Sequence, residues 1–157
     1  MKNMKKLNVF FAGLAVASMM SCASSEDWGL AVGKVFNTEC SNRTRTGITS
    51  MMKLMKDGDN ISCELTDYPV KCEHGDIDVS CKHNGFNLDI TLDQNMGEGT
   101  LGTNCTCRIN IYFTVYGATE DSYHVTLGNL DVGDVSFKGH SSVLVNLATL
   151  EQKYVDE

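Results

Sequence analysis

The stretch Asn104-Cys-Thr-Cys-Arg-Ile-Asn-Ile-Tyr-Phe-Thr-Val-Tyr-Gly117 decides the predicted fold. From Cys105 to Val115, every second residue is a cysteine or an apolar residue, and more polar side chains stand between them. Since successive side chains of a β-strand point to opposite faces, this pattern predicts a long strand with one apolar and one wet face. We expect this strand at the centre of a sheet, with the core packed on its apolar face.

A second alternating pattern lies upstream, where residues 76–83 and 86–92 flank Asn84-Gly85. Asn-Gly between two alternating runs is typical of a two-residue type I′ hairpin turn. Such a turn pairs His83 with Phe86 and brings the apolar residues of both runs to one face. A slip of one residue would destroy this agreement. The same register gives the pairs Cys81 with Leu88, Val79 with Ile90 and Ile77 with Leu92.

Shorter segments extend the β pattern over most of the chain. The segment 48–56 fits either a helix or a strand, 122–128 is expected to form a hairpin with the central strand, and 148–157 is expected to be a helical turn or a loose tail. Pro69 is expected at a sheet edge or a strand start, where no amide donor is needed. The other predicted strands cover 29–37, 61–66, 68–72, 130–137 and 142–147.

About eight short strands with turn signals and little helix predict an all-β fold. Within that class, we expect an antiparallel β-sandwich of the immunoglobulin or fibronectin type. The chain of 157 residues is long enough for one such domain with a modest core.

The first 21 residues have the pattern of a signal peptide. Three lysines within residues 1–6 precede the apolar run 7–20, which is too short to span a bilayer as a stable helix. Ser21-Cys22 resembles a bacterial lipobox, in which the cysteine is lipidated; ordinary secretory cleavage, for instance after Ala23, is the alternative. We expect a type II signal peptide at 1–21, a lipidated tether at 22–28 and a single domain at 29–157.

Cysteine parity favours lipidation. The chain has seven cysteines, so six remain if Cys22 carries the lipid. Export places them in an oxidising compartment, which predicts up to three disulfides that staple the strands, with the pairing open. The six are Cys40, Cys63, Cys72, Cys81, Cys105 and Cys107.

The charge of the chain limits its partners. Loss of the three lysines in residues 1–21 changes the net charge from −7 to −10. A domain this acidic repels phosphates, which argues against binding to nucleic acid and against spreading on anionic lipid headgroups. The N-terminal lipid would then be the attachment to the membrane.

The stretch from Ile61 to Gly128 resembles the later half of small β-sandwich lipoproteins of gut Bacteroidetes. The resemblance rests on Cys-x-Cys at 105–107, the alternating strand after it, a short loop and Tyr-x-Val-x-Leu at 123–127. It implies a β-sandwich, a location at the outer membrane or cell surface, and no particular activity. Ala23 and the acidic pair Glu26-Asp27 resemble the sorting and surface-export signals of such lipoproteins. Further matching features are Cys72 and Asn84-Gly85, whereas Cys40, Cys63 and Cys81 fall outside the pattern.

Residue spacing gives little sign of catalytic chemistry. The pairs at 72/74, 81/83 and 105/107 have ligands for tetrahedral zinc, but disulfides are favoured in an oxidising compartment. Asp57-Gly-Asp-Asn60 begins like a calcium loop, yet Ile61 and Tyr68 stand where oxygen ligands belong. There is no phosphate-binding glycine loop and no complete nucleophile elbow. We therefore predict no metal, no cofactor and no enzymatic activity.

The sequence is best explained by a binding or structural module, anchored by lipid at the bacterial outer membrane, with an envelope protein or a polysaccharide as ligand. The outward positions of the central strand supply a possible ligand stripe, Arg108, Tyr112 and Tyr116, since exposed aromatic side chains favour sugar and protein contacts. One alternative is an envelope hydrolase whose site is assembled from residues distant in sequence. Another is a secreted, disulfide-rich, inhibitor-like protein.

Lipidation at Cys22 is directly testable. Metabolic labelling with a palmitate analogue should mark the wild-type chain and leave Cys22→Ala unlabelled, because the thiol is the acceptor of the lipid. Equal labelling of both would refute the lipoprotein prediction.

Overall fold

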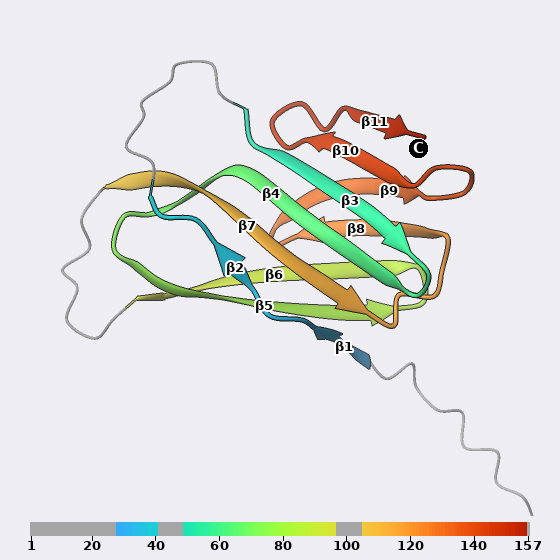
Figure 1. The fold of residues 1–157 in the computed structure, drawn as a ribbon, viewed down its shortest axis with the longest axis horizontal. Coiled ribbons are helices and arrows are strands. Elements are labelled where there is room, and N and C mark those ends of the chain that lie inside the picture. Colours follow the sequence, from blue (N-terminus) through green and yellow to red (C-terminus); the bar gives the residue numbers. More distant parts are fainter. Residues whose placement is uncertain (1–27, 41–48, 97–104, 157) are drawn as a thin grey trace, which may run out of the picture.

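The computed structural model describes residues 28–40, 49–96 and 105–156. The predicted signal peptide, Cys22 and nearly all of the tether therefore lie outside the described residues. The described part forms an all-β fold of eleven strands (Figure 1). They are β1 Trp28–Val32, β2 Phe36–Asn37, β3 Met51–Asp57, β4 Asn60–Lys71, β5 His74–Asn84, β6 Asn87–Met96, β7 Thr106–Tyr116, β8 Ser122–Leu127, β9 Leu130–Ser136, β10 Ser142–Asn146 and β11 Gln152–Val155.

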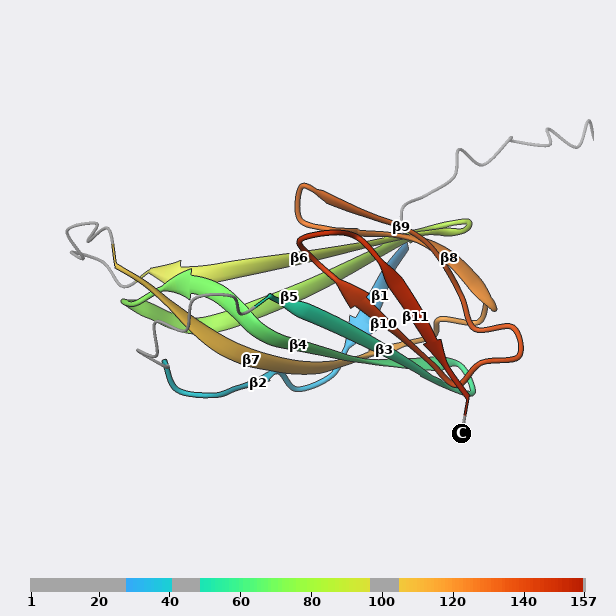
Figure 2. The same ribbon diagram turned by 90° about the horizontal axis from the view of Figure 1, so that it is seen from above.

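The strands form one continuous path, β11-β10-β3-β4-β7-β1-β5-β6-β8-β9, with β2 paired to β7 beside it. This sheet curls into a half-barrel with two limbs, one from β11 to β7 and the other from β5 to β9 (Figure 2). Strand β1 joins the limbs, because Trp28–Leu30 pair with β5 whereas Ala31 and Val32 pair with β7. One pair, β6 with β8, is parallel, which corrects the expectation of a purely antiparallel fold.

Strand β7 is the central strand that the sequence predicts. One edge pairs with β4 and the other with β2 and β1. Its side chains alternate between buried and more exposed along its whole length. The buried positions join a single core that both limbs line; in β7 they are Cys107, Ile109, Ile111, Phe113 and Val115.

The hairpin of β5 and β6 exists, but its predicted register is wrong by two residues. The structure pairs His83 with Leu88 and Asn84 with Asn87, so Gly85 and Phe86 are the central turn residues. Gly85 has φ 62°, a conformation that favours glycine at the first central position of a type II′ turn. A shift of two residues keeps every side chain on its face, so alternation alone cannot distinguish the two registers.

The predicted hairpin of β7 with the next strand is also wrong. Strand β8 lies in the other limb, where it pairs with β6 and β9. The connection 117–121 therefore crosses from one limb to the other. The hydroxyl of buried Tyr123 accepts a hydrogen bond from the Glu120 N–H at 2.8 Å, which fixes this connection to the core. The hairpin partner of β8 is β9, which it reaches through a turn with φ 59° at Gly128.

The two ambiguous segments are both strands. Residues 51–57 form β3, and residues 152–155 form β11 on the edge of β10, which corrects the expected helical turn or tail. The two strands predicted at 61–66 and 68–72 are halves of the single strand β4, interrupted at a bulge near Asp67, which has φ 51°. Strand β3 pairs with β4 only as far as Thr66, so Pro69 occupies an edge portion of β4, as expected.

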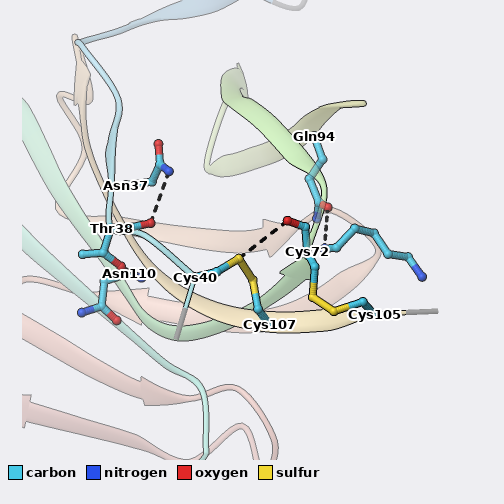
Figure 3. Close-up of a disulfide and its surroundings, with 9 residues drawn as sticks. Asn37, Thr38, Cys40, Cys72, Gln94, Cys105, Cys107 and Asn110 are labelled. Atoms are coloured by element: carbon cyan, nitrogen blue, oxygen red, sulfur yellow. Dashed lines mark hydrogen bonds between the residues drawn. A yellow bond between two sulfur atoms is a disulfide. The ribbon is translucent and has the colours of Figure 1, made fainter. Parts of the chain in front are cut away.

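Two disulfides fix the end of β7 (Figure 3). Cys107 bonds to Cys40 and Cys105 bonds to Cys72, with Cα–Cα distances of 5.5 and 5.3 Å. Cys40 follows β2 and Cys72 follows β4, so both neighbours of β7 are tied to it covalently. This confirms that Cys105 and Cys107 bond to cysteines on adjacent segments.

Cys63 and Cys81 depart from the predicted disulfide set, since both are free thiols buried in the core. They lie on different limbs, where Cys63 is opposite Phe113 and Cys81 is opposite Leu30. Burial raises the pKa of Cys81 to about 12. Burial is the largest cause that raises the pKa of Cys63 well above its ordinary value, followed by repulsion from the negative charges of an ionised Cys81 and of Glu64. Neither is therefore a reactive thiolate near neutral pH.

Peptide mapping without reduction should recover two bridges, Cys40–Cys107 and Cys72–Cys105. Because raised pKa values and burial suppress the thiolate, iodoacetamide at pH about 8 should label Cys63 and Cys81 only after unfolding. Rapid labelling of either in the native protein would contradict this arrangement.

Removing one bridge should cost stability without changing the fold class. For Cys72→Ser/Cys105→Ser, we expect the free energy of unfolding to fall by about 3–4 kcal/mol, because the unfolded chain gains conformational entropy when the bridge no longer closes a loop. Denaturant unfolding measures the change. A loss below about 1 kcal/mol would show that the bridge adds little to the β4–β7 ladder.

Candidate functional site

The outward side of β7 carries a row of exposed aromatic rings, which we call the aromatic face. It consists of Phe36, Tyr112 and Tyr116, which are 55%, 36% and 46% exposed. Phe36 is the direct cross-strand partner of Tyr112, so their side chains lie on the same side of the sheet. Tyr116 lies four residues further along β7, about 13 Å away at roughly 3.3 Å per residue.

The segment between β1 and β2 places the edge of this face. The Gly33 N–H donates a hydrogen bond to the Thr114 carbonyl at 2.8 Å, which holds the segment against β7. A Cβ on Gly33 would lie only 3.0 Å from the Tyr116 ring, so glycine allows the ring to lie against the backbone. Thr38 continues the attachment, since it exchanges hydrogen bonds with the Asn110 backbone through its own N–H and its hydroxyl, each at 3.0 Å.

Charged and polar side chains surround the aromatic rings. The Lys34 ammonium lies 5.0 Å from the centre of the Phe36 ring, which is a cation–π contact. Glu64 is the cross-strand partner of Tyr112 on the other side of β7. A shallow cavity of about 220 Å³ lies among these groups and is also lined by Ser62 and Thr114. The face therefore combines flat apolar rings with hydrogen-bond donors and acceptors.

The predicted stripe of Arg108, Tyr112 and Tyr116 is only partly assembled. The two tyrosines share the aromatic face, but the Arg108 guanidinium donates to the Asp67 carbonyl at 2.8 Å and to the Ser50 hydroxyl at 3.3 Å, at the bulge of β4. Sequence reasoning missed Phe36, because its two-residue strand has no alternating pattern.

A second polar group lies on the other limb, around His124. Its Nδ1 is 2.7 Å from an Asp134 oxygen and its Nε2 is 3.1 Å from an Asp131 oxygen. Both ring nitrogens therefore face carboxylates, and neither is available as a base for a nucleophile. The nearby hydroxyls of Ser122 and Ser136 bond to each other at 3.0 Å. This group is a surface charge cluster without the geometry of a hydrolytic triad.

The cysteine and histidine pairs considered for zinc are not assembled into a site. Cys72 and Cys105 are bonded to each other, as are Cys40 and Cys107. Within 28–40, 49–96 and 105–156, no three histidine, cysteine or acidic side chains are placed to hold a metal ion together. The β3–β4 turn at residues 58 and 59 occupies the sequence that begins like a calcium loop.

In comparisons with known proteins, no family model, no curated protein and no solved structure matches the chain. The part of the chain that the structure describes contains no helix long and apolar enough to cross a membrane. The interpretation of the site therefore rests on its own geometry.

The charge cluster predicts a specific pH dependence. The hydrogen bond to Asp134 is the largest cause that raises the pKa of His124, followed after opposing desolvation by the charge of Asp131. A raised folded-state pKa stabilises the protein below the unfolded value of about 6.5, and this contribution is lost as pH rises through the folded pKa.

NMR titration of the His124 ring should give a midpoint above about 6.5. Asp134→Asn should lower that midpoint more than Asp131→Asn, because the hydrogen bond is the larger cause. An identical midpoint in wild type and Asp134→Asn would contradict the assignment.

Proposed function

We propose that this protein is an exported, lipid-anchored binding module that holds a polysaccharide on its aromatic face without chemical turnover. The observation that carries the proposal is the outward row of Phe36 on β2 and Tyr112 and Tyr116 on β7, three large rings left exposed on the outer side of β7, whose inward side chains are all buried. Exposed aromatic rings beside polar groups are suited to sugars, whose faces are apolar and whose edges carry hydroxyls.

The arrangement favours an extended glycan over a monosaccharide. Tyr112 and Tyr116 are separated by about 13 Å, which is further than one sugar ring reaches. Lys34 and Glu64 supply a donor and an acceptor close to the first pair of rings. The backbone beneath the face is fixed by three-strand pairing and the two disulfides, so little conformational entropy is lost on binding.

Two further aspects belong to the same proposal. The two limbs are proposed to correspond to the layers of an immunoglobulin-like β-sandwich, with β1 as the strand that passes between them; the core enclosed by both limbs supports this. Attachment at the outer membrane or cell surface is supported by the lipobox-like Ser21-Cys22 and by the resemblance to Bacteroidetes lipoproteins. That location would present the aromatic face to envelope or dietary glycans.

A protein partner is the second candidate for this face, since tyrosine and phenylalanine are also common at protein interfaces. The small cavity and the charged rim favour the sugar. His124 offers no support for an envelope hydrolase, because both of its ring nitrogens face carboxylates.

The proposal predicts a selective loss of glycan binding. A soluble mature chain, residues 23–157, retains every described strand and the core, and can be screened on a glycan array and by affinity electrophoresis in polysaccharide gels. Tyr112→Ala/Tyr116→Ala should weaken retention in the polysaccharide gel about tenfold or more, because the loss of each ring removes a stacking contact of about 0.5–1.5 kcal/mol.

A matched control is Tyr154→Ala. Tyr154 is 38% exposed, which is close to the value for Tyr112. It is the cross-strand partner of buried Val143, so its side chain lies on the core side of the sheet, whereas the aromatic face lies on the outer side. Its loss should leave retention unchanged, and neither variant should lower stability by much more than about 0.5 kcal/mol. Equal retention of wild type and the double variant, or hydrolysis of a glycan by the pure protein, would overturn the proposal.

A further inference from the structure

A cavity of about 310 Å³ opens beside the bulge of β4, on the part of the molecule that Arg108 reaches. It forms there because β3 stops pairing with β4 at Thr66, which leaves the remainder of β4 with a free edge. Residues 49–50 before β3 and 147–148 after β10 border the opening. The turn between β8 and β9 closes it from the other limb.

The interior of this cavity is mainly apolar. Leu127 is buried, and Leu130 and Leu147 are half-buried, so the three leucines offer a contact surface for a hydrocarbon group. Tyr68 and Pro69 add apolar surface from the free edge of β4. A volume of about 310 Å³ is at the small end of ligand pockets, which limits the occupant to a small molecule.

Arg108 supplies a positive charge that no described carboxylate neutralises. Its two hydrogen bonds go to neutral oxygens, the Asp67 carbonyl and the Ser50 hydroxyl. The ion pairs among the described residues involve only His124 and His140. A guanidinium has five N–H donors in a planar fork that matches a carboxylate, so donors remain for a second, anionic acceptor.

Tyr68 provides another donor at the same place. Its half-buried phenol makes no hydrogen bond to any residue that the structure describes. Burial raises the pKa of Tyr68, so the hydroxyl stays protonated at neutral pH and can donate to an anion.

We propose that this cavity is a second binding site, for a small amphiphilic carboxylate whose acid group pairs with Arg108 and whose apolar body lies against Leu127, Leu130 and Leu147. The site differs from the aromatic face in position and in ligand chemistry, since it needs no sugar hydroxyls. A charged partner also explains why a partly buried arginine in so acidic a chain is left without a carboxylate.

Octanoate and octanamide are matched probes, because they share the apolar body and differ in charge. Calorimetry with the soluble mature chain should show that octanoate binds at least about tenfold more tightly than octanamide, as a charge-assisted hydrogen bond requires. NMR shifts caused by octanoate should be centred on residues 127, 130 and 147. Shifts centred on the aromatic face, equal binding of the two probes, or no binding of octanoate would overturn the proposal.

Three variants separate the site from general effects on folding. Arg108→Met keeps the apolar stem and should abolish the preference for octanoate, whereas Arg108→Lys should retain it. Leu147→Trp fills the cavity away from Arg108 and should weaken both probes alike. Thermal unfolding of each variant checks that the fold is intact. An unchanged preference in Arg108→Met would overturn the role of the guanidinium, and retained glycan binding in all three would show that the two sites are independent.

Discussion

The structure depends on β7 being hydrogen-bonded along both edges. Strand β4 occupies one edge, and β2 and β1 share the other. A strand paired on both sides cannot rotate or slip by one residue without exposing its apolar side chains. Because Ile111 and Phe113 must stay in the core, Tyr112 and Tyr116 must stay outside. The same constraint therefore sets the core and leaves the aromatic face exposed.

The irregularities of the sheet, more than its regular ladders, create its possible sites. At the bulge of β4, the Asp67 N–H donates to the Asn110 side chain, and its carbonyl accepts hydrogen bonds from Ser50 and Arg108. These bonds satisfy the N–H and carbonyl of Asp67, which have no partner in the β3–β4 ladder, because that ladder does not extend beyond the Met51–Thr66 pair. The bulge thus both draws Arg108 away from the tyrosines and opens the cavity that it borders.

The covalent bridges and the crossing strand β1 suit a module that presents a rigid surface. Cys40 and Cys72 hold the segments on either side of β7, while β1 ties one limb to the other through backbone pairing. The rings on the aromatic face are therefore carried by backbone with few alternative conformations. Such pre-organisation lowers the entropy lost on binding, which matters most for ligands with weak individual contacts, as sugars are.

Local alternation determined much of this protein. Period-2 patterning predicted the all-β class, the central strand, its inward residues from Cys107 to Val115 and the two outward tyrosines, because the pleat sends neighbouring side chains to opposite faces whatever strand lies alongside. Cys105, which the same pattern placed on the apolar face, instead lies before β7 and is exposed. The position of Pro69 at an edge followed from its missing N–H in the same way.

Only the tertiary structure decided which strands meet. Alternation is unchanged by a two-residue shift, so it could not fix the turn at Gly85-Phe86, and it carries no information on whether β8 pairs with β7 or β6. Cysteine parity likewise could not choose among pairings or show that Cys63 and Cys81 remain thiols. The addition of Phe36 to the aromatic face and the departure of Arg108 from it have the same cause: both follow from contacts between segments far apart in the chain, which no local pattern encodes.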